Sequence, residues 1–309
     1  MSNTNENSWR EITGADYIKF IETHSYVVIE DTKLEIGKPN EIKLLQPKEF
    51  NLATTTVWSF PKRGDWATHY LNAKYGENWA PQVARNLILR YSNEGDAVLD
   101  AFVGSGTTLI ETKLTNRNGI GVDINEDAVM LTRDRLQFPS LKNDFLEQKT
   151  YVGDARHMDF LKDESIDLIA THPPYLNIIP YTKNSNKRAD GDLSKIHSLD
   201  EFCNEMGKVA KEFYRVLKPD KYCAILIGDT RRHKHEVPVA FRVMQVFLNN
   251  GFALKEDVIK VQHNTKMASL WSKKSVKNNF LLLMHEHLFV FRKPAPGENL
   301  KELSESYKI

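Results

Sequence analysis

The clearest pattern in the chain is a series of short, mostly apolar runs that each end in glycine or polar residues. Such runs occupy 97–100, 119–123, 149–152, 166–169 and 222–227. Segments with helical spacing of apolar residues separate them, and this alternation predicts βα units and a parallel sheet covered by helices. The polar residues that end each run would gather at one edge of the sheet, where open α/β sheets bind ligands.

Amphipathic helices are predicted between and after these runs. In the longest segment, Phe202, Val209 and Phe213 recur on one helical face. Pro81 suits the first turn of another helix. Helices are expected at 81–91, 109–114, 126–136, 199–217 and 238–248, and two further strands at 251–261 and 287–292.

One main domain is predicted over 54–293, between an N-terminal extension at 1–53 and a C-terminal tail at 294–309. The extension has only weak periodicity, and we expect it to pack on the main domain or to be partly mobile. Three polar segments within the domain are predicted to be recognition loops, because long loops in compact domains are usually functional or disordered. They lie near 176–197, 229–237 and 262–284.

Composition narrows the class of protein. The chain has 309 residues with a formal net charge of +1, so a basic nucleic-acid surface would have to be local. The N-terminus lacks a basic region followed by an apolar one, and no apolar run is long enough to cross a bilayer. Cys203 and Cys223 lack metal-ligand spacing. We therefore expect a soluble cytoplasmic protein with no membrane contact and no metal.

A glycine-rich turn follows the first central strand. Gly104 and Gly106 permit a tight turn that brings backbone amides to a ligand at the start of the next helix. The second strand ends on Asp123, a carboxylate able to accept hydrogen bonds from ribose hydroxyls. Leu109 stands where a dinucleotide-binding motif has its third glycine, which argues against NAD.

A second motif follows the strand at 166–169. Pro173 and Pro174 hold the backbone extended and remove two amide donors, which leaves carbonyl acceptors beside the flat ring of Tyr175. Acceptors beside an aromatic face suit the binding of a planar base by its amino group. The stretch taken alone is equally compatible with a proline-rich turn that ends a strand.

Other residues have more than one interpretation. Trp58 and Phe60 lie in an aromatic segment that either lines a ligand pocket or packs on the core. Asp154 ends the third strand and either binds an adenine amino group or caps the next turn. Basic residues in the three polar segments are candidates for phosphate contacts. These are Lys183, Lys187, Arg188, Arg231, Arg232, Lys273 and Lys274.

The two motifs together carry a family resemblance. Residues 100–108, DAFVGSGTT, resemble the cofactor motif of S-adenosylmethionine-dependent DNA amino-methyltransferases. Residues 171–175, THPPY, resemble their catalytic motif, in which Asp, Asn or Ser usually precedes Pro-Pro and an aromatic residue. The resemblance covers about 54–292. It implies an α/β, Rossmann-like class I methyltransferase fold: a seven-stranded, mostly parallel sheet with an antiparallel last strand and helices on both faces.

The resemblance also implies site residues. The catalytic ones would be His172, Pro173, Pro174 and Tyr175. The cofactor, S-adenosyl-L-methionine, would be bound by Trp58, Phe60, Asp100, Phe102, Gly104, Ser105, Gly106, Thr107, Thr108, Asp123, Ile124, Asp154 and Ala155. Two positions depart from the family pattern: Ala101 replaces a common proline, and His172 replaces Asp, Asn or Ser.

The expected reaction is methyl transfer from S-adenosylmethionine to an exocyclic amino group of a flipped base in double-stranded DNA. Thr171 before the motif, with Asn177 and Tyr181 after it, makes the stretch slightly closer to the Thr-Ser-Pro-Pro-Tyr form of cytosine-N4 enzymes. Cytosine N4 is therefore favoured over adenine N6. An RNA base amino-methyltransferase and a non-catalytic nucleic-acid-binding protein are the alternatives. A restriction endonuclease partner fits restriction-modification, and both a monomer and a dimer remain open.

Overall fold

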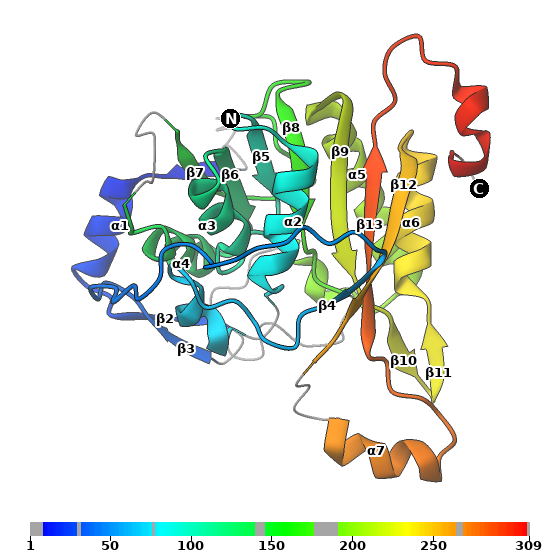
Figure 1. Ribbon diagram of the computed structural model, residues 1–309, viewed down its shortest axis with the longest axis horizontal. Coiled ribbons are helices and arrows are strands. Elements are labelled where there is room, and N and C mark those ends of the chain that lie inside the picture. The colour runs from blue at the N-terminus through cyan, green and yellow to red at the C-terminus, as the bar shows by residue number, and fades with distance from the viewer. Residues whose placement is uncertain are drawn as a thin grey trace, which may run out of the picture.

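The computed structural model describes residues 9–29, 32–75, 78–139, 146–175, 191–263 and 268–307. Within those ranges nine strands form one twisted sheet, and helices cover both of its faces (Figure 1). In chain order the strands of this sheet are β1 (Trp9–Ile12), β4 (Val57–Ser59), β5 (Ala97–Asp100), β6 (Asn118–Asp123), β7 (Gln148–Gly153), β8 (Ile166–Thr171), β9 (Leu217–Ile227), β12 (Ala253–Val261) and β13 (His285–Arg292).

The spatial order of the strands is β1-β7-β6-β5-β8-β9-β13-β12-β4. Neighbours from β7 to β9 pair in parallel, whereas β13 runs antiparallel between β9 and β12. The expected seven-stranded, mostly parallel sheet with an antiparallel last strand is therefore confirmed. Two short strands extend it: β1, from the N-terminal extension, pairs antiparallel with β7, and β4 pairs in parallel with β12.

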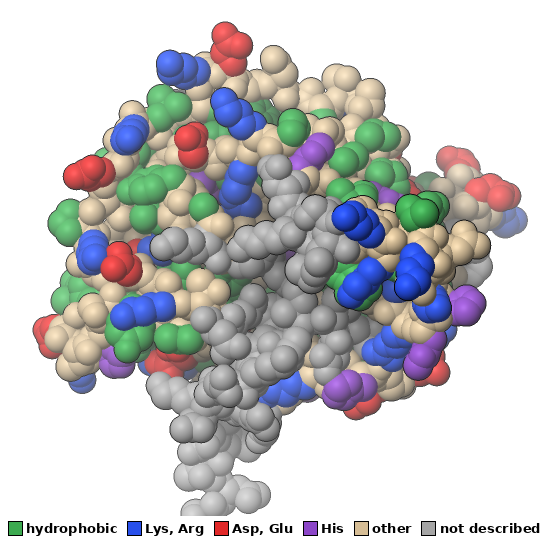
Figure 2. Space-filling view, turned by 90° about the horizontal axis from the view of Figure 1, so that it is seen from below, with side chains coloured by type: hydrophobic (Ala, Val, Ile, Leu, Met, Phe, Trp, Pro, Cys, Tyr) green, Lys and Arg blue, Asp and Glu red, His purple; other side chains and the backbone are tan. Residues whose placement is uncertain are grey.

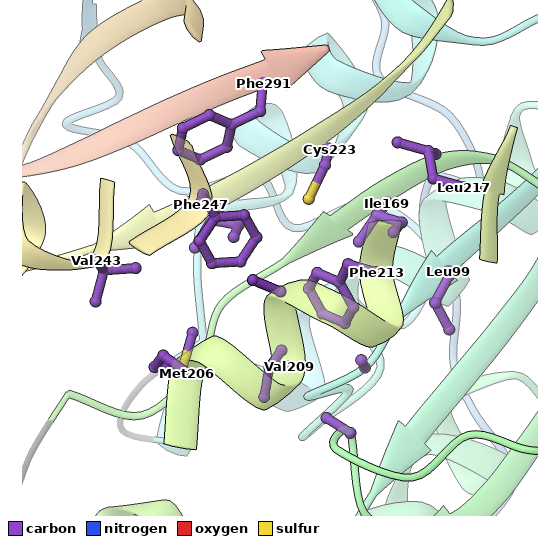
Figure 3. Packing of buried hydrophobic residues seen from close by; sticks show 14 of the residues in the cluster. Leu99, Ile169, Met206, Val209, Phe213, Leu217, Cys223, Val243, Phe247 and Phe291 are labelled. Carbon is purple, nitrogen blue, oxygen red and sulfur yellow. The ribbon is translucent and has the colours of Figure 1, made fainter. Parts of the chain in front are cut away.

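The core follows from the two-residue period of the central strands. On β8, Leu168 and Ala170 face one side of the sheet, and Ile169 faces the other. Helix α2 (Pro81–Tyr91) packs on the first side. Helices α5 (Leu199–Val216) and α6 (Val239–Asn249) pack on the second (Figure 3). Burial of both faces explains why the strands have continuous apolar runs rather than alternation.

The helix boundaries follow local sequence signals. Pro81 occupies the first turn of α2, as expected. The Ser198 hydroxyl accepts a hydrogen bond from the Glu201 amide at 3.3 Å and caps α5. The remaining α-helices of the main layers are α1 (Gly14–Ile21), α3 (Thr107–Leu114) and α4 (Glu126–Arg135).

Two segments that the sequence predicted as polar loops have regular structure. The segment 262–284 contains helix α7 (Ala268–Lys277), and 229–237 forms a hairpin of β10 (Thr230–Arg232) and β11 (His235–Val237). Both extend beyond the lower edge of the sheet in Figure 1. Helix α7 is largely polar, so apolar periodicity could not reveal it. The hairpin turns through His233 and Lys234, both with positive φ, which most hairpins achieve with Asn or Gly.

The two ends of the chain form small elements outside the central sheet. In the N-terminal extension, β2 (Tyr26–Ile29) pairs with β3 (Thr32–Glu35). In the C-terminal tail, Leu300–Ser306 forms a 3-10 helix. Among the described residues, none of the helices combines the length and the apolar character that crossing a membrane requires.

Candidate active site

Asp100 holds together the elements that surround the candidate site. It ends β5, and its carboxylate accepts hydrogen bonds from the Thr108 hydroxyl at 2.5 Å and the Thr171 hydroxyl at 2.6 Å. The Phe102 amide also donates to it, at 3.1 Å. Only 2% of Asp100 is exposed, and burial raises the pKa of its carboxyl to about 6 despite these donors. One carboxylate thus connects β5, α3 and β8.

The glycine turn between β5 and α3 contains two residues in the left-handed backbone region, which glycine adopts without strain. Gly104 and Gly106 have φ of 52° and 82°, and a Cβ at residue 106 would lie 2.9 Å from the Thr132 side chain. Ser105 is buried between them. Helix α3 starts at Thr107 without a side-chain cap. Its first amides are therefore available to a ligand.

Asp123 lies against this turn from the neighbouring strand β6. Its carboxylate accepts from the Gly104 amide at 3.0 Å and from the Asn125 amide at 2.9 Å. Burial within these loops raises the pKa of Asp123 to about 6. The glycine turn and the acidic strand end, recognised separately in the sequence, are thus in direct contact, with Ile124 next to them in the chain.

The stretch from His172 to Tyr175 follows β8 at the same edge of the sheet. His172 stacks on Trp79, with ring centroids 6.0 Å apart, and its Nε2 contacts the Tyr175 hydroxyl. Pro173 is buried and Pro174 is half-buried. The Tyr175 ring lies against Gly228, where an added Cβ would come within 2.9 Å of Cε2. A residue larger than glycine at position 228 would displace the ring.

The two motifs are neighbours in space. Strands β5 and β8 pair in parallel at Leu99 and Ile169, so both strands end at the same edge of the sheet. The hydrogen bond from Thr171 to Asp100 then fixes the start of the catalytic stretch to the start of the glycine turn. A donor bound at the turn would face an acceptor bound at Tyr175, as a group transfer requires.

Comparison with known proteins identifies the family to which the two motifs belong. A family model described as DNA methylase, of the N6 and N4 type, matches residues 4–134 and 166–308 and so covers most of the chain, both motifs included.

The chain belongs to the DNA methylase family. It is 41% identical over 85 residues to the type II methyltransferase M.HpaI of Haemophilus parainfluenzae, a match that covers 26% of each chain. It is 39% identical over 134 residues to the orphan methyltransferase M.BamHII of Bacillus amyloliquefaciens, covering 43% of this chain and 48% of that one. It is also 31% identical over 160 residues to a tRNA (guanine(10)-N2)-dimethyltransferase of Methanothermobacter thermautotrophicus, covering 48% and 44%. The chain spans less than half the length of each of these relatives.

Buried polar atoms near the glycine turn fit the cofactor that the sequence predicted, S-adenosyl-L-methionine. The Thr107 hydroxyl and two guanidinium nitrogens of Arg63, Nε and Nη2, are buried and have no hydrogen-bond partner in the described parts of the chain. Arg63 Nη1 donates to the Asn78 carbonyl at 3.2 Å, and Asn78 Nδ2 donates to the Ser105 hydroxyl at 3.3 Å. Burial lowers the pKa of Arg63 to about 10, so it remains charged at neutral pH. A buried unpaired cation and hydroxyl near the glycine turn suit an amino-acid carboxylate.

Asp154 and Ala155, at the end of β7, lie at the same edge of the sheet. Arg156 Nη2 contacts the Asp154 carboxylate at 2.5 Å and also donates to the Gly191 carbonyl at 2.9 Å. Ala155 is buried. Asp154 is thus held by an arginine that its sequence context did not suggest, and the role of this pair toward an adenine amino group stays a prediction.

Trp58 is buried in the core, and Phe60 is partly buried against it. Trp58 lies on the edge strand β4, is 4% exposed, and packs in the core cluster that contains Trp79 and Ala170. Its indole nitrogen donates to the Thr55 carbonyl at 2.9 Å. Phe60 packs on it edge to face. The structure thus shows that both rings pack on the core, and a contact of Trp58 or Phe60 with the cofactor stays a prediction.

The basic residues are divided among three places. Lys183, Lys187 and Arg188 lie outside the described residues. Figure 2 views the lower edge of the sheet, where lysine, arginine and histidine side chains gather on the side of β10, β11 and α7. Arg231 on β10 lies over the Phe280 ring, which connects the hairpin to the segment after α7. The four described candidates, Arg231, Arg232, Lys273 and Lys274, belong to the hairpin and α7, which Figure 1 shows at one end of the lower edge of the sheet.

Three residues near the site were not found from the sequence. Trp79, Lys260 and Glu286 contact the catalytic stretch or each other, although they lie far from it in the chain. Each is a single residue in a segment that otherwise has the pattern of a strand or a loop. Among the described residues, no group of three or more His, Cys, Asp or Glu side chains could hold a metal ion.

Proposed function

We propose that this methylase is a site-specific DNA methyltransferase that transfers a methyl group from S-adenosyl-L-methionine to an exocyclic amino nitrogen of a flipped base. The observation that carries the proposal is the connection of the two motifs through Asp100 and Thr171. Membership of the DNA methylase family supports DNA as the substrate.

The cofactor would bind along the glycine turn. Asp123 would accept hydrogen bonds from the ribose hydroxyls, and the first amides of α3 would lie beside the turn. Arg63 and Thr107, whose buried polar atoms have no partner in the described structure, would bind the carboxylate of the methionine end. When bound, S-adenosylmethionine supplies an electrophilic methyl group.

The chain's own residues would prepare the amino group. An exocyclic amine is a poor nucleophile because its lone pair is shared with the ring. The Pro173 carbonyl and the His172 side chain would accept its two hydrogens, which localises that lone pair toward the methyl group. Tyr175 would stack on the base, which pays about a few kcal/mol to leave the duplex. Positioning and electrostatics suffice for this transfer, and no covalent enzyme intermediate is needed.

We keep cytosine N4 as the favoured target and adenine N6 as the alternative. Part of the preference came from Thr171, whose hydroxyl donates to Asp100 in the structure and therefore has a structural use. The preference for cytosine thus depends on the resemblance of the motif to the cytosine-N4 form. The two products have different masses and are directly distinguishable.

An RNA substrate is the second candidate, because a tRNA (guanine(10)-N2)-dimethyltransferase is among the relatives. The test is to incubate the protein with methyl-labelled S-adenosylmethionine and either mixed-sequence duplex DNA or structured RNA. Nucleosides from the product are then identified by mass spectrometry. We expect N4-methylcytosine, or N6-methyladenine, in DNA only. Methyl transfer to RNA alone would overturn the proposal, and cofactor binding without transfer would favour a non-catalytic nucleic-acid-binding protein.

The matched control for this assay is Tyr175→Ala, which removes the stacking ring but touches none of the proposed cofactor residues. We expect it to bind S-adenosylmethionine normally and to transfer no methyl group. Long-read sequencing of DNA from cells that express the wild-type protein and this variant would then give the modified base and its recognition sequence together.

A further inference from the structure

A buried ion pair lies behind the catalytic stretch. Glu286, on β13, is 5% exposed. Its Oε1 accepts a hydrogen bond from the Tyr175 hydroxyl at 2.7 Å, and its Oε2 accepts one from Lys260 Nζ, on β12, at 2.6 Å. Neither Glu286 nor Lys260 belongs to either motif, and both come from the last two long strands of the sheet.

The hydrogen bonds determine where the protons lie. Burial alone would raise the pKa of Glu286, but the Lys260 ammonium and the hydrogen bond from the Tyr175 hydroxyl hold it below its ordinary value. The carboxylate is therefore ionised at neutral pH and can only accept. The single hydroxyl proton of Tyr175 goes to Glu286, so the tyrosine oxygen accepts from Nε2–H of His172. A neutral imidazole has one N–H and one acceptor nitrogen, so with the proton on Nε2 the acceptor of the His172 ring is Nδ1.

We propose that Glu286 is a positioning residue for the methyl transfer, acting through the Tyr175 hydroxyl. It fixes the orientation of the tyrosine ring and the tautomer of His172 before a base arrives, and Lys260 compensates its buried charge. The effect of Glu286 on the rate of methyl transfer rests on the proposed function. Preorganisation of this kind matters because small displacements of a catalytic group cost large factors in rate.

A matched pair of variants separates this role from a structural ion pair. Glu286→Met with Lys260→Met removes both charges and the acceptor, whereas Glu286→Gln with Lys260→Met removes both charges and keeps an acceptor oxygen. We expect the first to lower kcat by about ten- to a hundredfold with little change in KM for DNA, and the second to recover most of that loss. Equal activity of the two double variants would overturn the proposal.

Tyr175→Phe tests the route of the effect. It keeps the stacking ring and removes only the hydroxyl, so in this background the two double variants should have the same kcat. If the kcat values of the two double variants differ as much with Phe at position 175 as they do with Tyr175, Glu286 acts by another route. Asp257→Ala removes the carboxylate that contacts His287 Nδ1 between the same two strands. It controls for a general loss of contacts between β12 and β13 and should leave kcat unchanged.

Nitrogen NMR of the histidine rings tests the inference without DNA or turnover. The His172 signals are assigned by their loss in His172→Gln. We expect a proton on Nε2 in the wild type. We expect a shift of that proton to Nδ1 when Glu286→Met and Lys260→Met are combined, because the Tyr175 hydroxyl can then donate to Nε2. A wild-type proton on Nδ1, or no change in this double variant, would overturn the inference even if methyl transfer is confirmed. Absence of methyl transfer with the expected tautomers would instead overturn the proposed function.

Discussion

The Thr171 hydroxyl donates a hydrogen bond to the Asp100 carboxylate at 2.6 Å and so joins the ends of β8 and β5. Because Thr108 on α3 donates to the other oxygen of the same carboxylate, the glycine turn is fixed at both of its ends relative to the catalytic strand. A change at one of these residues should therefore affect the cofactor loop and the catalytic stretch together.

The first prediction concerns Thr171→Val, which keeps the shape and removes the hydroxyl. A buried carboxylate would lose one of its donors, so the free energy of unfolding should fall by about 1–3 kcal/mol at neutral pH. Cofactor affinity should fall as well. Urea unfolding and calorimetric titration with S-adenosylmethionine measure the two effects. Thr150→Val, which loses a hydrogen bond to the Ile12 carbonyl elsewhere in the sheet, should change stability alone. Unchanged cofactor affinity in Thr171→Val would contradict the link.

The second prediction is the pH dependence of cofactor binding. The pKa of Asp123 is raised from 3.8 to about 6, so its carboxylate is ionised above that pH and protonated below it. Ribose hydroxyls need the ionised form as an acceptor. Affinity should be constant above about pH 7 and fall by up to about tenfold per pH unit below 6, one proton being taken up. The free energy of unfolding of the protein without cofactor should instead rise as the pH falls through 6. Protonation of a buried carboxylate with a raised pKa favours the folded state.

Calorimetric titration across this pH range measures the dependence, and Asp123→Asn is its control. The variant should bind weakly at every pH. Any dependence that it retains would come from Asp100, whose pKa is also about 6. A wild-type affinity that stays flat below pH 6 would remove Asp123 from the ribose site.

The third prediction concerns the Arg63 guanidinium, whose buried Nε and Nη2 have no hydrogen-bond partner among the described residues. Because an uncompensated buried charge is costly, Arg63→Met should leave the free protein as stable as the wild type or more so. It should weaken binding of S-adenosylmethionine by about ten- to a hundredfold, the usual value of a hydrogen bond to a charged group. The exposed neighbour Lys62, changed to Met, should have no effect. Decarboxylated S-adenosylmethionine provides the sharper comparison, since wild type and Arg63→Met should bind it with equal affinity. If wild type still binds it more tightly than Arg63→Met, the cofactor carboxylate does not contact Arg63.

The parts of the site that were predictable from sequence are contiguous in the chain. The glycine turn and the stretch from His172 to Tyr175 each follow an apolar run directly, so the local order of strand, turn and helix determines their place at the sheet edge. Sheet topology then brings them together. The same logic located Asp123 and Asp154, because Asp123 ends β6 and Asp154 directly follows β7, both strands of the parallel series.

The contacts that were not predictable come from side chains far apart in the sequence. Periodicity identifies β12 and β13 as strands, but it does not tell that Lys260 and Glu286 pair across them and face Tyr175. Trp58 shows the reverse case. Its aromatic character suits a ligand pocket and a core equally. Its burial follows from the pairing of β4 with β12, and a strand of three residues is too short to be predicted from periodicity.

The last prediction concerns the basic side chains on the hairpin and on α7. Arg232 on β10 and Lys273 and Lys274 on α7 are exposed. If they contact phosphates, each change to Gln should weaken DNA binding alike for all sequences and reduce the slope of log affinity against log salt by about 1. Fluorescence anisotropy at several salt concentrations measures this slope. Lys19, exposed on α1, serves as the control, since its change to Gln should alter neither affinity nor slope. A slope unchanged in all three variants would show that the DNA lies elsewhere, because counterion release depends only on phosphates that the protein neutralises.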